Sequence, residues 1–195
     1  MTDINAAKEK AKAAVAAAKE ELVGVSLDIH SHPELALREE RAAKLLSDNL
    51  ESNGFAVERR LYNIGTAFRG TWGEGPVTLA YLLEYDALPE VGHACGHNLI
   101  ATAGLGGALG LKEALDPSQV KLVVLGTPAE EDMGGKVMLA AAGAFDGVDA
   151  AMMVHPAPLE IADPPMFGVE SVTVTYHGRG THAAIAPETA LNALD

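Results

Sequence analysis

The stretch VKLVVLGTPAEED, from Val120 to Asp132, decides the fold that we expect for this chain. Its first part, up to Gly126, is a short apolar run of the kind that is typical of a strand buried inside a sheet. Three consecutive carboxylates then follow, although a run of solvated charge is an unusual neighbour for a core element. Ligands gather at strand ends in layered α/β sheets, so the stretch predicts a buried strand that leads into a site.

Helices and strands are expected to alternate on both sides of this stretch. Strong helix formers with apolar residues at helical spacing predict the helices, and β-rich runs between turn residues predict the strands. In chain order we expect helices at 6–30 and 39–52, strands at 55–61, 66–72 and 77–83, a helix at 99–115, the strand at 120–126, a helix at 137–142 and a strand at 148–154. Residues 73–76, Gly-Glu-Gly-Pro, predict a hairpin between the second and third strands. The alternation predicts an α/β fold with a mostly parallel mixed sheet flanked by helices.

A second domain is expected near the end of the chain. Residues 157–165 are rich in proline and end the alternation, and residues 168–177 alternate again as a new strand. We therefore expect residues 1–167 to form the N-terminal part of one domain and residues 168–195 the start of a smaller α+β domain. A helix is expected to begin after Pro187, so we expect this second domain to continue beyond Asp195.

Composition excludes several classes of partner. The 195 residues carry a net charge of -13, and like charges repel a phosphate backbone, so a nucleic-acid partner is not expected. The 48% hydrophobic content suffices for a core, but no run approaches the ~18 apolar residues of a membrane span. The single cysteine forms no intramolecular disulfide, and the N-terminus lacks the apolar run of a signal peptide. We expect a cytoplasmic protein.

The densest cluster of potential metal ligands is GHACGHN, from Gly92 to Asn98, which we place on a turn between a strand and a helix. It offers the thiolate of Cys95 and the imidazoles of His93 and His97, and both groups are good ligands for zinc and related ions. Alone this cluster is a weak signal, because a buried cysteine with nearby capping histidines gives the same pattern.

Two other strand ends carry further ligand types. Glu130 and Glu131 follow the strand at 120–126, and His155 ends the strand at 148–154. Each has a structural alternative, since acidic residues also suit the first turn of a helix and a lone histidine at a strand end is more often structural. Together with the cysteine cluster, they supply sulfur, nitrogen and oxygen ligands from adjacent strand ends, as a pair of metal ions requires.

Several ordered segments make the pattern specific. They are EYDALP at 84–89, HACGHN at 93–98, GTPAEE at 126–131 and His-Pro at 155–156, with IHSHPEL at 29–35 and GRGTHAA at 178–184 on either side. With these segments the chain resembles the M20 family of metallopeptidases and amidohydrolases from Ser26 to its end. Within the family it looks most like the branch of aminobenzoyl-glutamate hydrolases and Xaa-Arg or β-alanyl-lysine dipeptidases.

The resemblance implies a zinc-exopeptidase-like catalytic domain that holds two divalent metal ions (zinc, manganese or cobalt) and is interrupted by a smaller lid domain. It implies that the metal ligands are Cys95, His97, Glu131 and His155. Glu130 is then the general base, Asp86 orients a ligand imidazole, and His182 in the lid segment binds substrate. The implied activity is hydrolysis of an amide or peptide bond in an N-acyl amino acid, aminobenzoyl-glutamate or a dipeptide, by metal-activated water. The full-length protein is expected to dimerise through the lid.

Two departures from the family pattern leave alternatives open. Peptidase members carry His-x-Asp where this chain has Glu84-Tyr85-Asp86, and a further histidine ligand is expected beyond Asp195. An inactive fragment or a degenerate metal-binding or ligand-binding protein of the same fold is therefore a second hypothesis. A zinc nucleobase deaminase is a third, but its Pro-Cys-x-x-Cys motif is absent.

Overall fold

The computed structural model describes residues 3–165, 168, 170 and 172–194. The chain divides into two compact units, Met1–Pro158 and Leu159–Asp195. The elements of the first unit are α1 (Ile4–Ala17), α2 (Lys19–Ser31), α3 (Glu40–Ser52), β1 (Ala56–Arg59), β2 (Phe68–Trp72), β3 (Val77–Leu83), α4 (His97–Ala114), β4 (Val120–Gly126), α5 (Glu130–Met133), α6 (Gly135–Ala141) and β5 (Ala150–Met152). No helix in the described ranges is long and apolar enough to cross a membrane.

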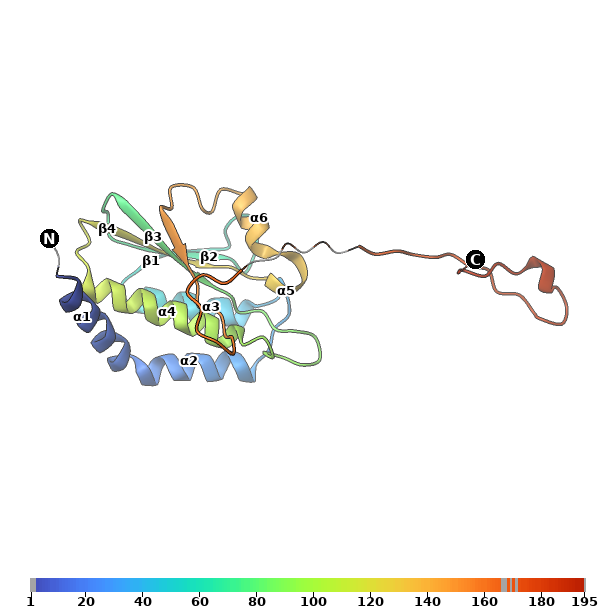
Figure 1. Ribbon diagram of the computed structural model, residues 1–195, viewed down its shortest axis with the longest axis horizontal. Coiled ribbons are helices and arrows are strands. Elements are labelled where there is room, and N and C mark those ends of the chain that lie inside the picture. Colours follow the sequence, from blue (N-terminus) through green and yellow to red (C-terminus); the bar gives the residue numbers. More distant parts are fainter. Residues whose placement is uncertain (1–2, 166–167, 169, 171, 195) are drawn as a thin grey trace. The chain divides into compact units, whose positions relative to one another are not determined.

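The strands of the first unit form one mixed sheet in the order β1-β2-β4-β3-β5. Strand β3 pairs in parallel with β4 and with β5, whereas β2 runs antiparallel to β4 and to β1. Helices flank this sheet (Figure 1), so the expected α/β fold is confirmed. Because β3, β4 and β5 are parallel, their carboxyl ends lie at the same edge of the sheet.

The hairpin predicted at residues 73–76 is wrong, because β4 lies between β2 and β3. The glycines serve a different purpose. Gly73 has a left-handed φ of +79°, and a Cβ atom on Gly75 would lie only 2.0 Å from the backbone carbon of Gln119. The connection therefore needs glycine because it passes against the backbone that leads into β4.

The single helix predicted at residues 6–30 is also wrong, since it breaks at Ala18 into α1 and α2. Both helices pack along α4 and meet at an angle (Figure 1). Glycines in α4 make this approach possible. A Cβ atom on Gly110 would lie 3.1 Å from the carbonyl oxygen of Ala11, and one on Gly106 would lie 3.0 Å from Leu22. The bend at Ala18 lets the N-terminal residues follow the surface of α4 over two helices.

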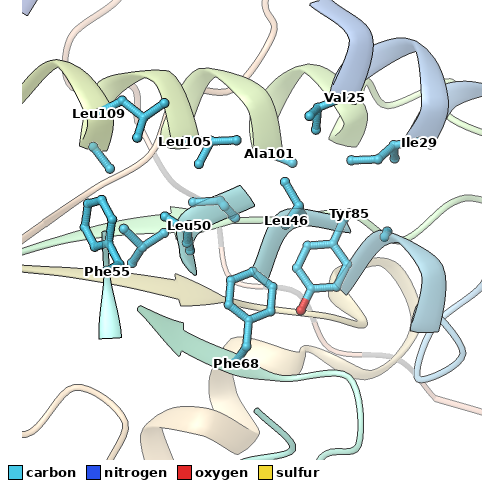
Figure 2. Close-up of a cluster of buried hydrophobic side chains, with 14 of the residues drawn as sticks. Val25, Ile29, Leu46, Leu50, Phe55, Phe68, Tyr85, Ala101, Leu105 and Leu109 are labelled. Atoms are coloured by element: carbon cyan, nitrogen blue, oxygen red, sulfur yellow. The ribbon is translucent and has the colours of Figure 1, made fainter. Parts of the chain in front are cut away.

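The main core lies between the sheet and the layer made by α3 and α4, with α2 closing one end. Figure 2 shows apolar side chains from these elements facing one another. Phe68 on β2 and Tyr85 after β3 stack with their ring centroids 5.8 Å apart. The hydroxyl of Tyr85 donates a hydrogen bond of 2.7 Å to the carbonyl of Thr66, which satisfies its polar end inside the core. This core fixes the strand ends that carry the candidate site.

Replacing Leu105 by alanine is expected to lower the free energy of unfolding by about 2–5 kcal/mol. Leu105 lies in α4, and its side chain is fully buried against the sheet, so truncation leaves a cavity. Leu99→Ala is the matched control, because Leu99 lies on the same helix but is 53% exposed. Its effect should stay within about 0.5 kcal/mol. Urea denaturation followed by circular dichroism measures both, and equal losses would contradict this position of the core.

The second unit contains the 3-10 helix η1 (Pro187–Thr189) and a bridge between Arg179 and Leu191. The strand predicted at 168–177 is not formed by residues 168, 170 and 172–177, and the remaining residues of that range lie outside the described chain. A strand needs a partner for its hydrogen bonds, and the described residues of this unit supply none there. The boundary predicted after residue 167 falls within this unit, and its role as a lid stays a prediction.

Candidate metal centre

The predicted site residues of the first unit gather at the carboxyl edge of the parallel strands. Leu83, the last residue of β3, pairs with Gly126, the last residue of β4, so both strands end at the same level. The residues that follow them are Glu84 and Asp86 after β3, Glu130 and Glu131 after β4, and His155 after β5. Cys95 joins them from the turn before α4, and His97 is the first residue of that helix.

His97 is the buried centre of this group. Its Nδ1 atom lies 2.8 Å from the carbonyl oxygen of Asp86 and 3.0 Å from the carboxylate oxygen Oδ1 of the same residue. Both partners accept hydrogen bonds, so Nδ1 carries the proton and donates it. In a neutral imidazole the other nitrogen, Nε2, then carries a free lone pair. Asp86 thus fixes the tautomer in which Nε2 can bind a cation.

Three carboxylates surround that nitrogen. The Nε2 atom of His97 lies 3.4 Å from Glu84, 3.6 Å from Glu131 and 3.7 Å from Glu130. Three of the facing atoms are buried without a hydrogen-bond partner: Nε2 of His97, Oε2 of Glu84 and Oε1 of Glu131. Acceptors cannot satisfy one another, and a proton serves only one at a time, whereas a divalent ion contacts several.

The ligand atoms form two overlapping sets that fit metal ions. Within each set all atoms lie within 4.8 Å of one another. The sets are Cys95, His97 and His155, and Glu84, His97 and Glu130. The Sγ atom of Cys95 is 3.6 Å from Nε2 of His155. Thiolate, imidazole and carboxylate are the donors that zinc and its neighbours prefer, so the residues present fit divalent cations.

The electrostatics of the group favour an added cation. Burial raises the pKa of the Cys95 thiol to about 11, and the neighbouring Glu131, Glu130 and Glu84 add to the rise. A divalent ion would reverse this effect, because its charge outweighs the carboxylates and favours the thiolate. Burial also raises the pKa of Glu130, with a further contribution from the charge of Glu84.

At Asp86 and His97, burial and hydrogen bonds shift the pKa in opposite directions. Burial disfavours the ionised form of Asp86, but hydrogen bonds from His97 and from backbone N–H groups outweigh it and hold the pKa of Asp86 below its usual value. Burial alone would lower the pKa of His97, yet the bond to Asp86 and the surrounding carboxylates raise it. Asp86 also accepts a 3.0 Å hydrogen bond from the backbone N–H of Glu131.

Sequence reasoning placed most of this group and missed part of it. The structure brings three of the predicted ligands, Cys95, His97 and His155, into one set, and the fourth, Glu131, lies 3.6 Å from His97 but in neither set. Glu130 and Asp86 lie beside His97, and the roles of all six residues stay predictions. The structure also places Glu130 and Glu131 in the first turn of the short helix α5, as the structural alternative had it. Glu84, which pairs with Lys136, was missed as a candidate ligand although it directly follows β3. The signal was available, since Glu84 stands in the same strand-end segment as Asp86.

His182 lies in the second unit. Its Nδ1 atom accepts a 3.2 Å hydrogen bond from the backbone N–H of Ala184, and the side chain is exposed. This local turn says nothing of a substrate, so its predicted role in substrate binding stays a prediction.

Comparisons with known proteins agree with this fold. Residues 80–194 match the model of peptidase family M20/M25/M40. The Xaa-Arg dipeptidase of Mus musculus is 44% identical over 203 residues, which cover 96% of this chain and 47% of that protein. One of the subunits of the p-aminobenzoyl-glutamate hydrolase of Escherichia coli K12 is 34% identical over 206 residues, which cover 93% and 42%. The chain thus spans about half the length of the curated relatives it matches.

A solved structure gives the same result. The fold resembles that of a dinuclear metal-binding peptidase of the M20 family from Bacillus subtilis, with a TM-score of 0.61 and 25% identity. The match covers 68% of this chain and 41% of that one. The first unit therefore has the fold of a metallopeptidase domain. The chain belongs to peptidase family M20/M25/M40.

Proposed function

We propose that the protein hydrolyses an amide or peptide bond in a small substrate, with two divalent ions of zinc, manganese or cobalt. One observation carries the proposal: buried acceptors without partners converge on the Nε2 atom of His97 at the carboxyl edge of the sheet. The names of two relatives support dipeptides and aminobenzoyl-glutamate as substrates, and a third relative, the N-acetyl-L-cysteine deacetylase of Bacillus subtilis, supports N-acyl amino acids.

The protein's own residues divide the work of holding the ions. In this proposal the ligands are Cys95, His97, Glu131 and His155. Asp86 positions two of them at once, because its carboxylate accepts from Nδ1 of His97 and from the backbone N–H of Glu131. Bound ions would acidify a water molecule and polarise the substrate carbonyl.

Glu130 is the general base of the proposal. Its side chain is 40% exposed, so it reaches both the buried carboxylates and the solvent side of the site. A carboxylate beside the bound ions can act both as proton acceptor and as proton donor during the reaction. Glu130 would take a proton from water and later give one to the leaving amine.

The test is hydrolysis by the whole protein of a panel that contains an Xaa-Arg dipeptide, β-alanyl-lysine, aminobenzoyl-glutamate and an N-acetyl amino acid. We expect turnover of at least one substrate, its loss after chelation, and its return with zinc, manganese or cobalt. Mass spectrometry should count two ions in each chain. Turnover by protein shown to be free of metal would contradict the proposal. Bound metal without turnover of any substrate would favour the degenerate binding protein.

Two further features belong to the proposal. We place the protein in the cytoplasm, since the one cysteine of these 195 residues is a proposed metal ligand and requires no oxidising compartment. We also propose that the whole protein forms a homodimer through its second domain, as the family resemblance implies. Light scattering of the whole protein tests the dimer, and a monomer would contradict it.

A further inference from the structure

Glu39 is a buried carboxylate that the proposed mechanism does not use. It directly precedes α3, and its side chain is fully buried. Its Oε1 atom accepts hydrogen bonds from the backbone N–H groups of Leu37, at 3.0 Å, and of Ala129, at 2.8 Å. Its Oε2 atom accepts from the hydroxyl of Thr66, at 2.9 Å. All three partners donate, so the side chain acts purely as an acceptor.

Helix capping does not explain this position. Glu39 makes no side-chain hydrogen bond to its own helix. Glu34 takes that task, because its two carboxylate oxygens accept from the backbone N–H groups of Arg41, at 3.0 Å, and Ala42, at 2.9 Å. Burying a carboxylate costs several kcal/mol unless its hydrogen bonds offset the loss of water. A role beyond the N-terminus of α3 would account for that cost.

The partner Ala129 has an unusual backbone. Its φ of 59° and ψ of 44° place it in the left-handed region, which costs a residue with a Cβ atom about 1–2 kcal/mol. Ala129 is the residue directly before Glu130 and Glu131, and it opens α5. Its N–H is held by Glu39, and two residues later the N–H of Glu131 is held by Asp86. Two buried carboxylates thus hold the two ends of the turn that presents the paired glutamates.

We infer that Glu39 is a positioning residue for the metal centre: it holds Ala129 in the left-handed conformation and so places Glu130 and Glu131. The inference rests on the proposed function for the roles of Glu130 and Glu131. The effect of Glu39 on the backbone conformation of Ala129 does not depend on that function. Glu39 touches neither substrate nor metal and acts through residue 129. Its hydrogen bond to Ala129 spans 90 positions of the sequence and ties the start of α3 to the start of α5.

The decisive variant is Glu39→Leu, which removes the acceptor and puts an apolar side chain of similar length in its place. We expect weaker binding of cobalt, which a titration monitored by absorption measures. We also expect a kcat lower by roughly 10- to 100-fold with little change in KM. Glu39→Gln is the conservative rescue, since its amide oxygen still accepts from both N–H groups and its NH₂ can donate to Thr66. It should keep most of the affinity and turnover. Thr66→Val is the matched control, because it removes only the bond to the other oxygen.

A second change reports on the backbone directly. Glycine adopts the left-handed conformation without the Cβ penalty, so Ala129→Gly in the Glu39→Leu background should restore part of the cobalt affinity. A crystal structure of Glu39→Leu should show Ala129 outside the left-handed region. If Glu39→Leu does not fold, Glu39→Asp replaces it, because the shorter side chain keeps the charge but withdraws the carboxylate from Ala129.

The possible failures are distinguishable. If the unaltered protein binds no metal and hydrolyses nothing, the proposed function fails, while the crystal structure of the variant still tests the hold on Ala129. If the unaltered protein is active and folded Glu39→Leu matches it in cobalt affinity, kcat and the conformation of Ala129, the inference is overturned.

Discussion

Replacement of Glu130 by glutamine is expected to lower kcat by about 10²- to 10⁴-fold while both metal ions stay bound. Glutamine has the same shape as glutamate but cannot take a proton from water. The side chain is partly exposed and makes no hydrogen bond that the fold depends on among the described residues, so the variant should fold. Steady-state kinetics on the whole protein and metal analysis of the same sample give both readouts.

The control for Glu130→Gln lies on the same short helix. Asp132 is exposed, and Asp132→Asn removes an equal charge from α5 without touching the centre, so it should keep nearly full activity. Wild-type turnover by Glu130→Gln would reject its role as base. If Glu130→Gln loses both one metal ion and its activity, Glu130 is instead a metal ligand, in the set that it forms with Glu84 and His97.

Local pattern was enough to predict the strands that position the site. The bounds of β3 and β4 agree with the ranges expected from apolar runs between turn residues, because a buried strand needs such a run wherever it lies in the sheet. The carboxylates after β4 and the histidine after β5 were placed for the same reason. Parallel strands bring the residues that follow them to one edge of the sheet. Predicting these strands from the sequence therefore already predicts that the residues lie close together.

Features that depend on distant partners were not predictable in this way. Gly73 and Gly75 predict an irregular backbone between β2 and β3. They do not predict that β4 lies between these two strands in the sheet. The alanine-rich N-terminus favours helix throughout and does not mark the break at Ala18, which depends on packing against α4. The same holds for Glu39, whose partner is 90 positions away. An acidic residue before a helix predicts a cap, and only the fold shows that Glu34 has taken that task.

Replacing a carboxylate of the metal centre is expected to change the free energy of unfolding in opposite directions with and without bound metal. Glu131→Gln is expected to leave the metal-free protein as stable as the original or more so, because it removes one of the carboxylates that face each other around His97. The same change should weaken metal binding by more than the roughly 10- to 100-fold that loss of an outer partner costs, since Glu131 is a proposed ligand. The repulsion between these carboxylates destabilises the metal-free protein, and the same negative charge favours the binding of a cation.

The measurement is thermal unfolding of both proteins, first with a chelator and then with zinc at a concentration 100 times the dissociation constant of the unaltered protein. That concentration stabilises the original by about 2.7 kcal/mol, whereas a variant with 100-fold weaker binding gains only about 0.4 kcal/mol. Asp132→Asn again serves as control and should respond to zinc as the original does. A variant that gains the full stabilisation would remove Glu131 from the ligand set. A metal-free variant less stable than the original would show that this carboxylate supports the fold rather than the ion.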